Sequence, residues 1–286
     1  MTHPPKVSIC IPTYNGARYI REAVVSALQQ EYPSFEIVIV DNCSTDGTEV
    51  LLSELLLQSD KIHFFKNETN IGLAGNFNKC LEHAQGEYIK YLCADDFLLP
   101  GCLEQMAAVL ESHPTVSLVC SGRTNINESR PLGLRRYSSR TAVVSGYEAI
   151  NRCLFGGNFI GEPTATMFRK SDARSEFRND LPQLLDMDMW FRLLERGDLY
   201  SIASPLCAIR CHSAQITQEN IKSGKIIDDN ILIFDEFSKK AYLRVSFWPI
   251  IRHKWMMAYR VWVSRQYISK KKRWISLNDM GLEIFI

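Results

Sequence analysis

Short apolar runs alternate with amphipathic stretches along the first hundred residues. The apolar runs at 7–11, 35–40 and 62–66 are too short for helices and end at polar or turn residues. Residues 19–30 and 48–59 instead repeat apolar side chains every three or four positions, as a helix does. The same reading predicts a further helix and strand over 76–85 and 87–93. Strands and helices that alternate with short connections indicate an α/β sheet whose strands are mostly parallel.

Polar residues follow three of these strands directly. Thr13-Tyr14-Asn15 come after the first strand, Asp41 after the second, and Asp95-Asp96 after the fourth. Ligands of parallel α/β sheets bind beyond the carboxyl ends of the strands. The pattern therefore predicts that these groups meet at one edge of the sheet and form a binding site.

Each cluster also has an ordinary structural interpretation. Adjacent carboxylates at Asp95 and Asp96 suit Mg²⁺ or Mn²⁺ together with substrate phosphates, but also a solvated turn or a helix cap. Asp41 can accept hydrogen bonds from a nucleobase N–H or a ribose hydroxyl, yet Asp-Asn-Cys-Ser is a common turn. The glycines at 72 and 75 match neither a dinucleotide fingerprint nor a P-loop.

A second acidic patch lies at the predicted start of a helix in the second half of the chain. Asp186 and Asp188 precede the apolar positions Trp190 and Leu193. A carboxylate there is stabilised by the helix dipole, or it acts as a general base for a hydroxyl nucleophile. His212 is either a ligand for metal or phosphate, or a structural histidine.

Composition restricts the class of protein. A chain of 286 residues with 46% hydrophobic and 23% charged side chains is globular, which excludes disordered and fibrous proteins. Nine cysteines without a CxxC pair favour reduced thiols in the cytoplasm, and the first residues lack the apolar run of a secretory signal.

Charge and tryptophan are unevenly distributed. Residues 239–286 carry 11 Lys and Arg against two acidic residues, whereas residues 1–238 have a net charge of −8. Within the stretch 249–273, apolar and aromatic residues recur on one helical face, flanked by basic residues. Such a helix lies on an anionic membrane surface or packs on the acidic body, and charges interrupt it too often for a transmembrane span. Nucleic-acid binding is disfavoured because no basic patch accompanies the predicted site.

Taken in order, these segments resemble the inverting family 2 glycosyltransferases of the GT-A fold. The resemblance rests on VSICIPTYNG, EIVIVDNCSTDGT, LCADDFLLP, LLDMDMWFRLLERGD and IRCHSAQIT, and covers about residues 6–217. It implies a Rossmann-like GT-A fold with a mixed, mostly parallel sheet flanked by helices. From the change in charge near residue 225, we expect this domain over 1–225 and a basic, tryptophan-rich helical extension over 226–286. The resemblance is to enzymes of bacterial cell-surface polysaccharide synthesis, such as that of lipopolysaccharide O-antigen.

The resemblance also implies roles for individual residues. Asp186 would be the catalytic base, with Asp188 as the second candidate. Asp95, Asp96 and His212 would contact a bound Mn²⁺ or Mg²⁺. The nucleotide-sugar would be bound by the strand-end and loop residues Pro12, Thr13, Tyr14, Asn15, Asp41, Gly72, Asn76 and Asp95. The segment 158–164 is expected near the acceptor.

Two positions depart from the family pattern. Cys93 stands where the motif has its first aspartate, which leaves fewer hard ligands for a metal, and Leu185 replaces a glutamate before Asp186. The resemblance still implies single displacement of a sugar from a nucleotide donor, with UDP- and dTDP-sugars favoured, to a hydroxyl of a glycan or lipid-linked oligosaccharide. The reaction would take place in the cytoplasm or on the cytoplasmic face of the inner membrane. The alternative is a non-catalytic relative that binds a nucleotide-sugar or glycan.

Overall fold

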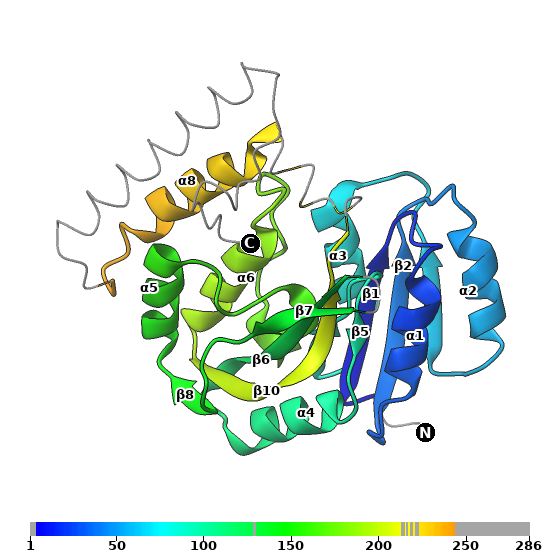
Figure 1. The fold of residues 1–286 in the computed structure, drawn as a ribbon, viewed down its shortest axis with the longest axis horizontal. Helices are drawn as coiled ribbons and strands as arrows, with labels where there is room; N and C mark the ends of the chain where they lie inside the picture. The colour runs from blue at the N-terminus through cyan, green and yellow to red at the C-terminus, as the bar shows by residue number, and fades with distance from the viewer. Residues whose placement is uncertain are drawn as a thin grey trace.

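The computed structural model describes residues 4–127, 130–212, 215, 217, 220 and 223–243 of the 286-residue chain. Within them one ten-stranded sheet has the order β3-β2-β1-β4-β9-β6-β10-β5, with β7 added beside β6 and β8 beside β10 (Figure 1). The strands are β1 (Val7–Thr13), β2 (Phe35–Asp41), β3 (Ile62–Lys66), β4 (Tyr88–Tyr91), β5 (Phe97–Leu98), β6 (Val116–Asn127), β7 (Arg130–Arg135), β8 (Ala142–Val144), β9 (Thr166–Arg169) and β10 (Asp198–Arg210).

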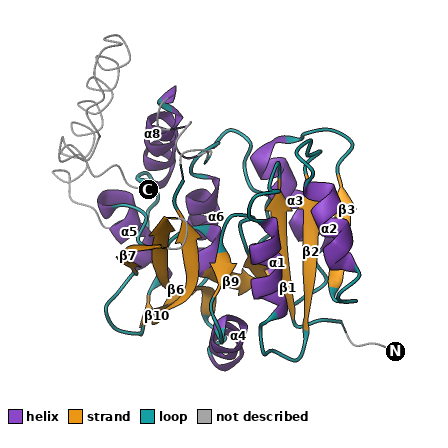
Figure 2. Ribbon diagram, turned by 45° about the vertical axis from the view of Figure 1, so that its right-hand side comes forward, coloured by secondary structure: helices purple, strands orange, loops and turns teal. Residues whose placement is uncertain are grey.

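Helices cover both faces of this sheet (Figure 2). One apolar core contains side chains of α1, α2 and α4, and a second contains side chains of α3, α5, α6 and α8. The helices are α1 (Ile20–Leu28), α2 (Thr48–Leu56), α3 (Gly72–His83), α4 (Cys102–Ser112), α5 (Gly146–Gly156), α6 (Leu185–Leu194) and α8 (Lys225–Phe237), with 3₁₀ turns η1 (Pro163–Ala165) and η2 (Lys170–Asp172).

The apolar runs at 7–11 and 35–40 are continuous because both faces of their strands are buried. In β2, Ile37 and Ile39 point into the core with α1 and α2, whereas Val38 and Val40 point into the core with α3. Side chains of a strand alternate between faces, so a strand covered on both sides needs apolar residues at every position.

The strand directions bring the carboxyl ends of six strands to one edge of the sheet. β3, β2, β1 and β4 are parallel neighbours in that order. β9 runs antiparallel to both β4 and β6, so β6 has the direction of β4, and β10 is parallel to β6. The loops after β1, β2 and β4 and the ends of β6 and β10 therefore share the edge where ligands of such sheets bind. The predicted mixed, mostly parallel GT-A sheet is confirmed.

One helix begins earlier than the hydrophobic pattern predicts. We expect a helix over 76–85, but α3 starts at Gly72. The Asn42 side-chain oxygen accepts a hydrogen bond from the Ile71 amide, and the Asn70 side-chain oxygen accepts one from the Gly72 amide. These contacts satisfy amides at the start of α3. The Asn42 contact comes from a distant segment of the chain, so helical spacing does not reveal it.

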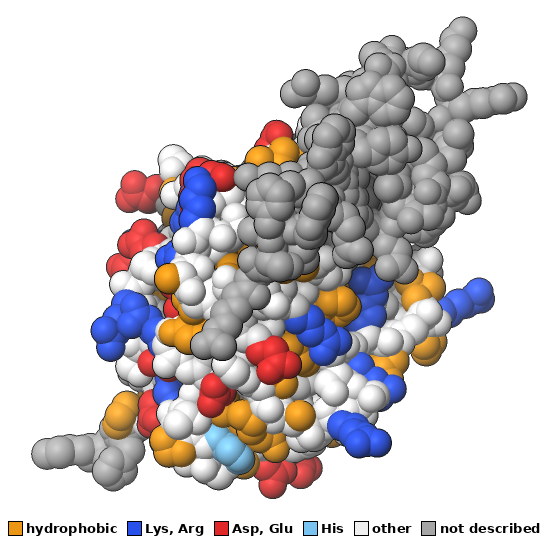
Figure 3. All heavy atoms as spheres, turned by 90° about the vertical axis from the view of Figure 1, so that its left-hand side faces the viewer, with side chains coloured by type: hydrophobic (Ala, Val, Ile, Leu, Met, Phe, Trp, Pro, Cys, Tyr) orange, Lys and Arg blue, Asp and Glu red, His pale blue; other side chains and the backbone are white. Residues whose placement is uncertain are grey.

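The chain beyond residue 225 is described only as far as residue 243. α8 packs its apolar side into the second core, where the Phe237 ring lies 4.9 Å from that of Phe191 in α6. The basic and aromatic stretch 249–273 lies outside the described residues, so the prediction of a membrane-binding helix stays a prediction. On the face in Figure 3, acidic and basic side chains of the described part are interspersed.

Candidate active site

Asp41 ends β2 as a fully buried carboxylate. Both of its oxygens accept hydrogen bonds from Ser44, one from the amide at 3.1 Å and one from the hydroxyl. The Ser-Thr-Asp-Gly turn thus folds back on the strand end and fixes the carboxylate. Because each carboxylate oxygen accepts more than one hydrogen bond, Asp41 keeps capacity for a ligand N–H or O–H.

The loop after β1 is tied to the same turn. The Asn15 amide donates to Ser44 Oγ at 2.8 Å, and Asn15 Oδ1 accepts from the Thr45 amide at 2.9 Å. Asn15 has a φ of 51°, in the left-handed region that asparagine tolerates. Thr13 is buried and its hydroxyl has no hydrogen-bond partner among the described residues, whereas Tyr14 is about half exposed. Hydrogen bonds therefore join the loops after β1 and β2 into one rigid unit at the sheet edge.

The remaining predicted nucleotide-site residues have different surroundings. Pro12 is buried within β1, opposite Val40 of β2. Asn76 lies beneath the edge, where its amide donates to the main-chain oxygens of Thr13 and Val40. Gly72 is exposed and has a φ of +81°, and no atom lies within 4 Å of the position of a Cβ. Asn76 thus holds β1 and β2 together from below, while Gly72 borders open space.

Asp95 and His212 come together although 117 residues separate them. His212 Nε2 lies 3.1 Å from Asp95 Oδ2, and Gln215 Nε2 lies 3.4 Å from the same oxygen. The Asp95 and His212 side chains are both partly exposed. No cluster of three His, Cys, Asp or Glu side chains with metal-binding geometry occurs among the described residues. A carboxylate and an imidazole that converge in this way fit a hard cation that takes its other ligands from phosphates and water.

Asp96 points into the protein and is only 3% exposed. Its Oδ2 accepts a hydrogen bond from Thr164 Oγ1 at 2.6 Å, and its Oδ1 accepts one from the Arg210 amide at 2.9 Å. Burial raises the pKa of Asp96 well above its usual value, and the Asp95 charge raises it further. Asp96 therefore fixes the loop after β4 to η1 and β10, rather than facing open solvent.

Thr164, which donates to Asp96, is fixed in turn by hydrogen bonds from β4 and from the loop that follows it. The fully buried ammonium of Lys90 in β4 donates to the main-chain oxygen of Thr164 and, at 3.2 Å, to that of Thr166. The Cys93 amide donates to Thr164 Oγ1 at 3.0 Å. Thr164 is thus the junction between η1 and the loop 93–96.

The Cys93 thiol lies among carboxylates. Burial raises its pKa well above the usual value, and the charges of Asp96, Asp95 and Asp186 raise it further, in that order. The thiol therefore stays protonated without a metal, and a neutral thiol is a poor ligand for a hard cation. All three carboxylates act on this one sulfur, so the loop after β4 and the start of α6 face each other.

Asp186 stands in the first turn of α6 and is partly exposed. Burial raises its pKa to about 7; hydrogen bonding to the Met187 amide at 2.7 Å opposes this shift, and the Glu162 charge adds to it. A carboxylate that titrates near neutral pH, at the edge where the polar loops meet, has the properties of a general base.

Asp188 is enclosed by basic side chains. It is 1% exposed, and its Oδ2 accepts a hydrogen bond from Arg192 Nε at 2.8 Å, while Arg178 Nη1 lies 3.5 Å from Oδ1. Burial raises its pKa, and the Arg192 and Arg178 charges oppose that shift. A carboxylate held by two guanidinium groups stabilises α6 and is a weaker candidate for the base than Asp186.

Arg210 supports the site, although the sequence pattern does not single it out. Its Nε donates to the Asp95 main-chain oxygen at 2.9 Å, and its Nη2 pairs with Glu22 at 2.8 Å. The guanidinium also lies over the Tyr19 ring, 4.4 Å from its centroid, and the same ring lies 5.2 Å from that of His212. The spacing of Arg210 and His212 in IRCHSAQIT is the signal that would have identified it.

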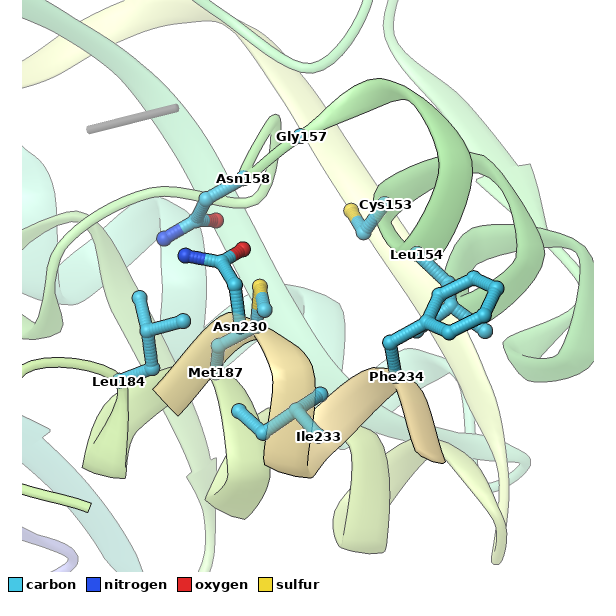
Figure 4. A pocket seen from close by; sticks show the side chains of 9 residues that line it. All are labelled: Cys153, Leu154, Gly157, Asn158, Leu184, Met187, Asn230, Ile233 and Phe234. Carbon is cyan, nitrogen blue, oxygen red and sulfur yellow. The ribbon is translucent and has the colours of Figure 1, made fainter. Parts of the chain in front are cut away.

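A small pocket near Asp186 is not the substrate site. Its cavity of about 10 Å³ lies between α5, α6 and α8, and holds roughly one water molecule. In Figure 4 the amides of Asn158 and Asn230 lie close to each other, with Met187, Ile233 and Phe234 among the apolar residues that line the cavity. It belongs to the packing of α8 on the body.

Comparisons with known proteins agree with this geometry. The model of the family "Glycosyl transferase family 2" matches residues 8–177. The chain is 45% identical over 222 residues to a Bacillus subtilis (strain 168) protein, TuaG, whose name assigns it to teichuronic acid biosynthesis as a glycosyltransferase. The match covers 77% of this chain and 85% of TuaG.

Solved structures show the same fold at lower sequence identity. S. aureus TarS in complex with UDP-GlcNAc superposes with a TM-score of 0.62 at 21% identity, covering 86% of this chain and 79% of that one. The mannosyltransferase PcManGT from Pyrobaculum calidifontis, in complex with GDP-Man and Mn²⁺, gives a TM-score of 0.60 at 18% identity, covering 98% and 79%. Both likenesses concern the fold alone.

Across the part of the chain that the structure describes, no helix is long and apolar enough to cross a membrane. The order of polar loops along the sheet edge, the match of the family model over residues 8–177 and the 45% identity to TuaG lead to one assignment. The chain belongs to glycosyltransferase family 2 and is a GT-A-fold transferase related to enzymes of bacterial surface-polysaccharide synthesis.

Proposed function

We propose that this glycosyltransferase moves a sugar from a nucleotide-sugar to a hydroxyl acceptor with inversion at the anomeric carbon. The observation that carries the proposal is the meeting of Asp95 and His212 at 3.1 Å, beside the loops that hold Asp41. In this proposal Asp95 and His212 bind the diphosphate, and Asp41 at the end of β2 binds the nucleobase. TarS and PcManGT, which share the fold, were solved with nucleotide-sugars, and this supports the same class of donor here.

Asp186 acts as the base in this mechanism. It accepts the proton of the acceptor hydroxyl as that oxygen attacks the anomeric carbon from the face opposite the leaving nucleotide. A pKa of about 7 lets the carboxylate hold the proton when the sugar bond forms and release it to solvent afterwards. Since the mechanism is a single displacement, it needs no covalent enzyme intermediate.

Asp95 and His212 would hold Mn²⁺ or Mg²⁺ together with the diphosphate. When bound, the cation supplies positive charge that stabilises the leaving diphosphate. Arg210 keeps Asp95 in place through its main-chain oxygen, and Thr164 keeps Asp96 turned inward. The Mn²⁺ in the PcManGT complex supports this assignment.

UDP- and dTDP-sugars are the proposed donors. Uracil and thymine both carry an N3–H that can donate a hydrogen bond to the Asp41 carboxylate. The acceptor is a glycan or lipid-linked oligosaccharide of a surface polysaccharide, in keeping with the name of TuaG. Residues 1–225 form the transferase domain in this proposal. We propose that the enzyme works in the cytoplasm, and that the basic stretch 249–273 of the extension over 226–286 binds the cytoplasmic face of the inner membrane.

A thermal-shift screen tests the donor and the metal together. The protein is heated with UDP, dTDP, GDP or CDP, each with and without Mn²⁺, because a ligand that binds the folded state raises the midpoint. We expect UDP or dTDP to raise it, more strongly with Mn²⁺, and Asp95→Asn to abolish the metal-dependent part. Failure of all four nucleotides would contradict the proposal. Donor binding without transfer or hydrolysis would indicate a non-catalytic relative. The observation behind this second candidate is the thiol of Cys93, which stands in the metal motif in place of a carboxylate.

A further inference from the structure

An ion pair between a buried arginine and a partly exposed glutamate at the active-site edge takes no part in the steps above. Arg123, near the carboxyl end of β6, is 2% exposed, and its Nε forms an ion pair with Glu162. Its Nη1 has no hydrogen-bond partner among the described residues, and neither does Oδ1 of Asn125, two positions along the strand. Buried polar atoms nearly always have a partner. These three residues, the β6 polar cluster, therefore have hydrogen-bonding capacity that the described protein leaves unused.

The chain on either side of Glu162 fixes the position of the cluster. The preceding Gly161 oxygen accepts a hydrogen bond from Trp190 Nε1 at 3.1 Å, and Trp190 lies one helical turn after Asp186. Two residues after Glu162, Thr164 donates to Asp96. The Glu162 charge raises the pKa of both Asp96 and Asp186. The cluster thus lies between the proposed diphosphate side of the site and the proposed base.

Gly161 allows the Arg123 guanidinium to lie against the segment that contains Gly161 and Glu162. Gly161 has a φ of +117°, and a Cβ there would come within 2.9 Å of Arg123 Nη1. The close approach brings a planar donor group and a carboxylate side by side. A guanidinium N–H donates, whereas the carboxylate and the Asn125 oxygen accept, so the cluster can bind a hydroxyl group in both directions.

The charges around the cluster restrict what it can bind. Arg123 supplies the positive charge of the cluster, and it is already paired with Glu162. The Glu162 charge already raises the pKa of both Asp96 and Asp186, so a further carboxylate placed among these groups would be repelled. The surroundings therefore favour a neutral polyhydroxyl ring over a uronate.

We infer that the β6 polar cluster binds hydroxyls of the transferred sugar and selects a neutral hexose over a hexuronate. In a single displacement the sugar must span the space between diphosphate and base, which is where the cluster lies. The inference rests on the proposed function and deepens it. It gives Arg123, Asn125 and Glu162 a role in donor specificity.

Titration calorimetry with UDP, UDP-glucose and UDP-glucuronate, in the presence of Mn²⁺, tests the inference. The two sugars differ only at C6, a hydroxymethyl group in one and a carboxylate in the other. We expect the wild type to bind UDP-glucose about 10-fold more tightly than UDP-glucuronate. Arg123→Lys keeps the positive charge but loses the fork of donors. It should weaken UDP-glucose about 10-fold while the Kd of UDP changes less than about 2-fold.

Glu162→Gln is a second variant, and its effect on the preference between the two sugars is one that a merely structural role of Glu162 would not produce. The Glu162 side chain is 23% exposed, so the nearly isosteric amide is expected to fold. Loss of the negative charge should make UDP-glucuronate bind more tightly, whereas UDP binding stays unchanged. The thermal midpoint of each variant without ligand reports whether it is folded.

The outcomes separate the inference from the proposed function. Equal affinity of the wild type for both sugars, or variants that change UDP as much as UDP-glucose, would overturn the inference. If neither variant changes the ratio of the affinities for UDP-glucose and UDP-glucuronate, the inference is also overturned, and the cluster binds water only. If the wild type binds neither UDP nor dTDP, the proposed function itself fails, and the inference fails with it.

Discussion

The two sides of the active-site edge use their polar groups in opposite ways. On the proposed nucleotide side, Asp41 and Asn15 are held by hydrogen bonds within and between neighbouring loops. On the proposed sugar side, burial raises the pKa of Asp96 and Asp186, and Arg123 Nη1 has no hydrogen-bond partner within the described part of the chain. The first side is preorganised to bind, while the second holds groups in states that favour proton transfer or ligand contact. Changes on the two sides should therefore affect different measurements.

Asp186→Asn should have the largest effect, and only on catalysis. The amide cannot accept the acceptor's proton, so we expect kcat to fall roughly 10²–10⁴-fold. Binding of UDP or dTDP should remain within about 2-fold, because Asp186 lies on the sugar side. Transfer or donor hydrolysis gives kcat, and calorimetry gives the nucleotide Kd. A variant that keeps its rate would exclude Asp186 as the base.

The pH dependence of the rate is the next largest effect. The base must be deprotonated, and its pKa is about 7, so the rate should fall about 10-fold per pH unit below 7 and level off above it. Measurement of kcat between pH 5 and 9 at saturating donor gives the profile. A rate that stays constant down to pH 5 would mean that the base titrates near the ordinary value of a carboxyl group.

Stability should change with pH in the opposite sense to the rate. The folded-state pKa of Asp186 is raised above its unfolded value, so the folded protein binds more protons between about pH 4 and pH 7. Asp186 therefore makes the free energy of unfolding fall as pH rises through that window. Urea denaturation at pH 5 and pH 8 should show a smaller decrease in Asp186→Asn than in the wild type. Equal decreases in both proteins would contradict the raised pKa.

Asp188→Asn should lower stability rather than rate, in contrast to its neighbour two residues away. The change weakens hydrogen-bonded ion pairs with Arg192 and Arg178, so we expect a loss of about 2 kcal/mol in the free energy of unfolding. Asp180→Asn is the matched control, since Asp180 also pairs with Arg178 but is mostly exposed, and should cost less than about 1 kcal/mol. A large loss of kcat with unchanged stability would assign Asp188 the catalytic role instead.

The same contrast explains what could be predicted from the sequence. The nucleotide side is built from strand ends and the turns that follow them, so Asp41 and the 13–15 loop are visible as local patterns. The sugar side is assembled from segments far apart in the chain. Arg123 is an ordinary residue of a long strand, and nothing in its neighbourhood in sequence indicates that Glu162 will pair with it.

Among the carboxylates, sequence could name candidates but not separate them. Asp186 and Asp188 are equivalent as helix-start acids in the sequence, and only the positions of Arg178 and Arg192 distinguish them. Likewise, the adjacent aspartates at 95 and 96 point to different environments. Asp95 faces His212, and Asp96 faces Thr164. Direction of a side chain relative to a distant segment is a tertiary property, and hydrophobic spacing does not encode it.

The smallest predicted effect belongs to Gly72 on the nucleotide side. Alanine in place of Gly72 must adopt a φ of +81°, which costs about 1 kcal/mol for a residue with a Cβ, although the space around it is open. Gly133→Ala is the matched control: it too has open space around its Cβ, but its φ is not in the left-handed region, and it should be neutral or slightly stabilising.

Urea denaturation gives the stability of both variants, and calorimetry gives their affinity for UDP or dTDP. If Gly72 borders the bound nucleotide, its methyl group should weaken nucleotide binding by more than its effect on stability explains, because strain in a folded loop alone leaves the binding constant of the folded protein unchanged. A Gly72→Ala variant that is destabilised but binds the nucleotide normally would place Gly72 outside the nucleotide site and restrict that site to the loops after β1 and β2.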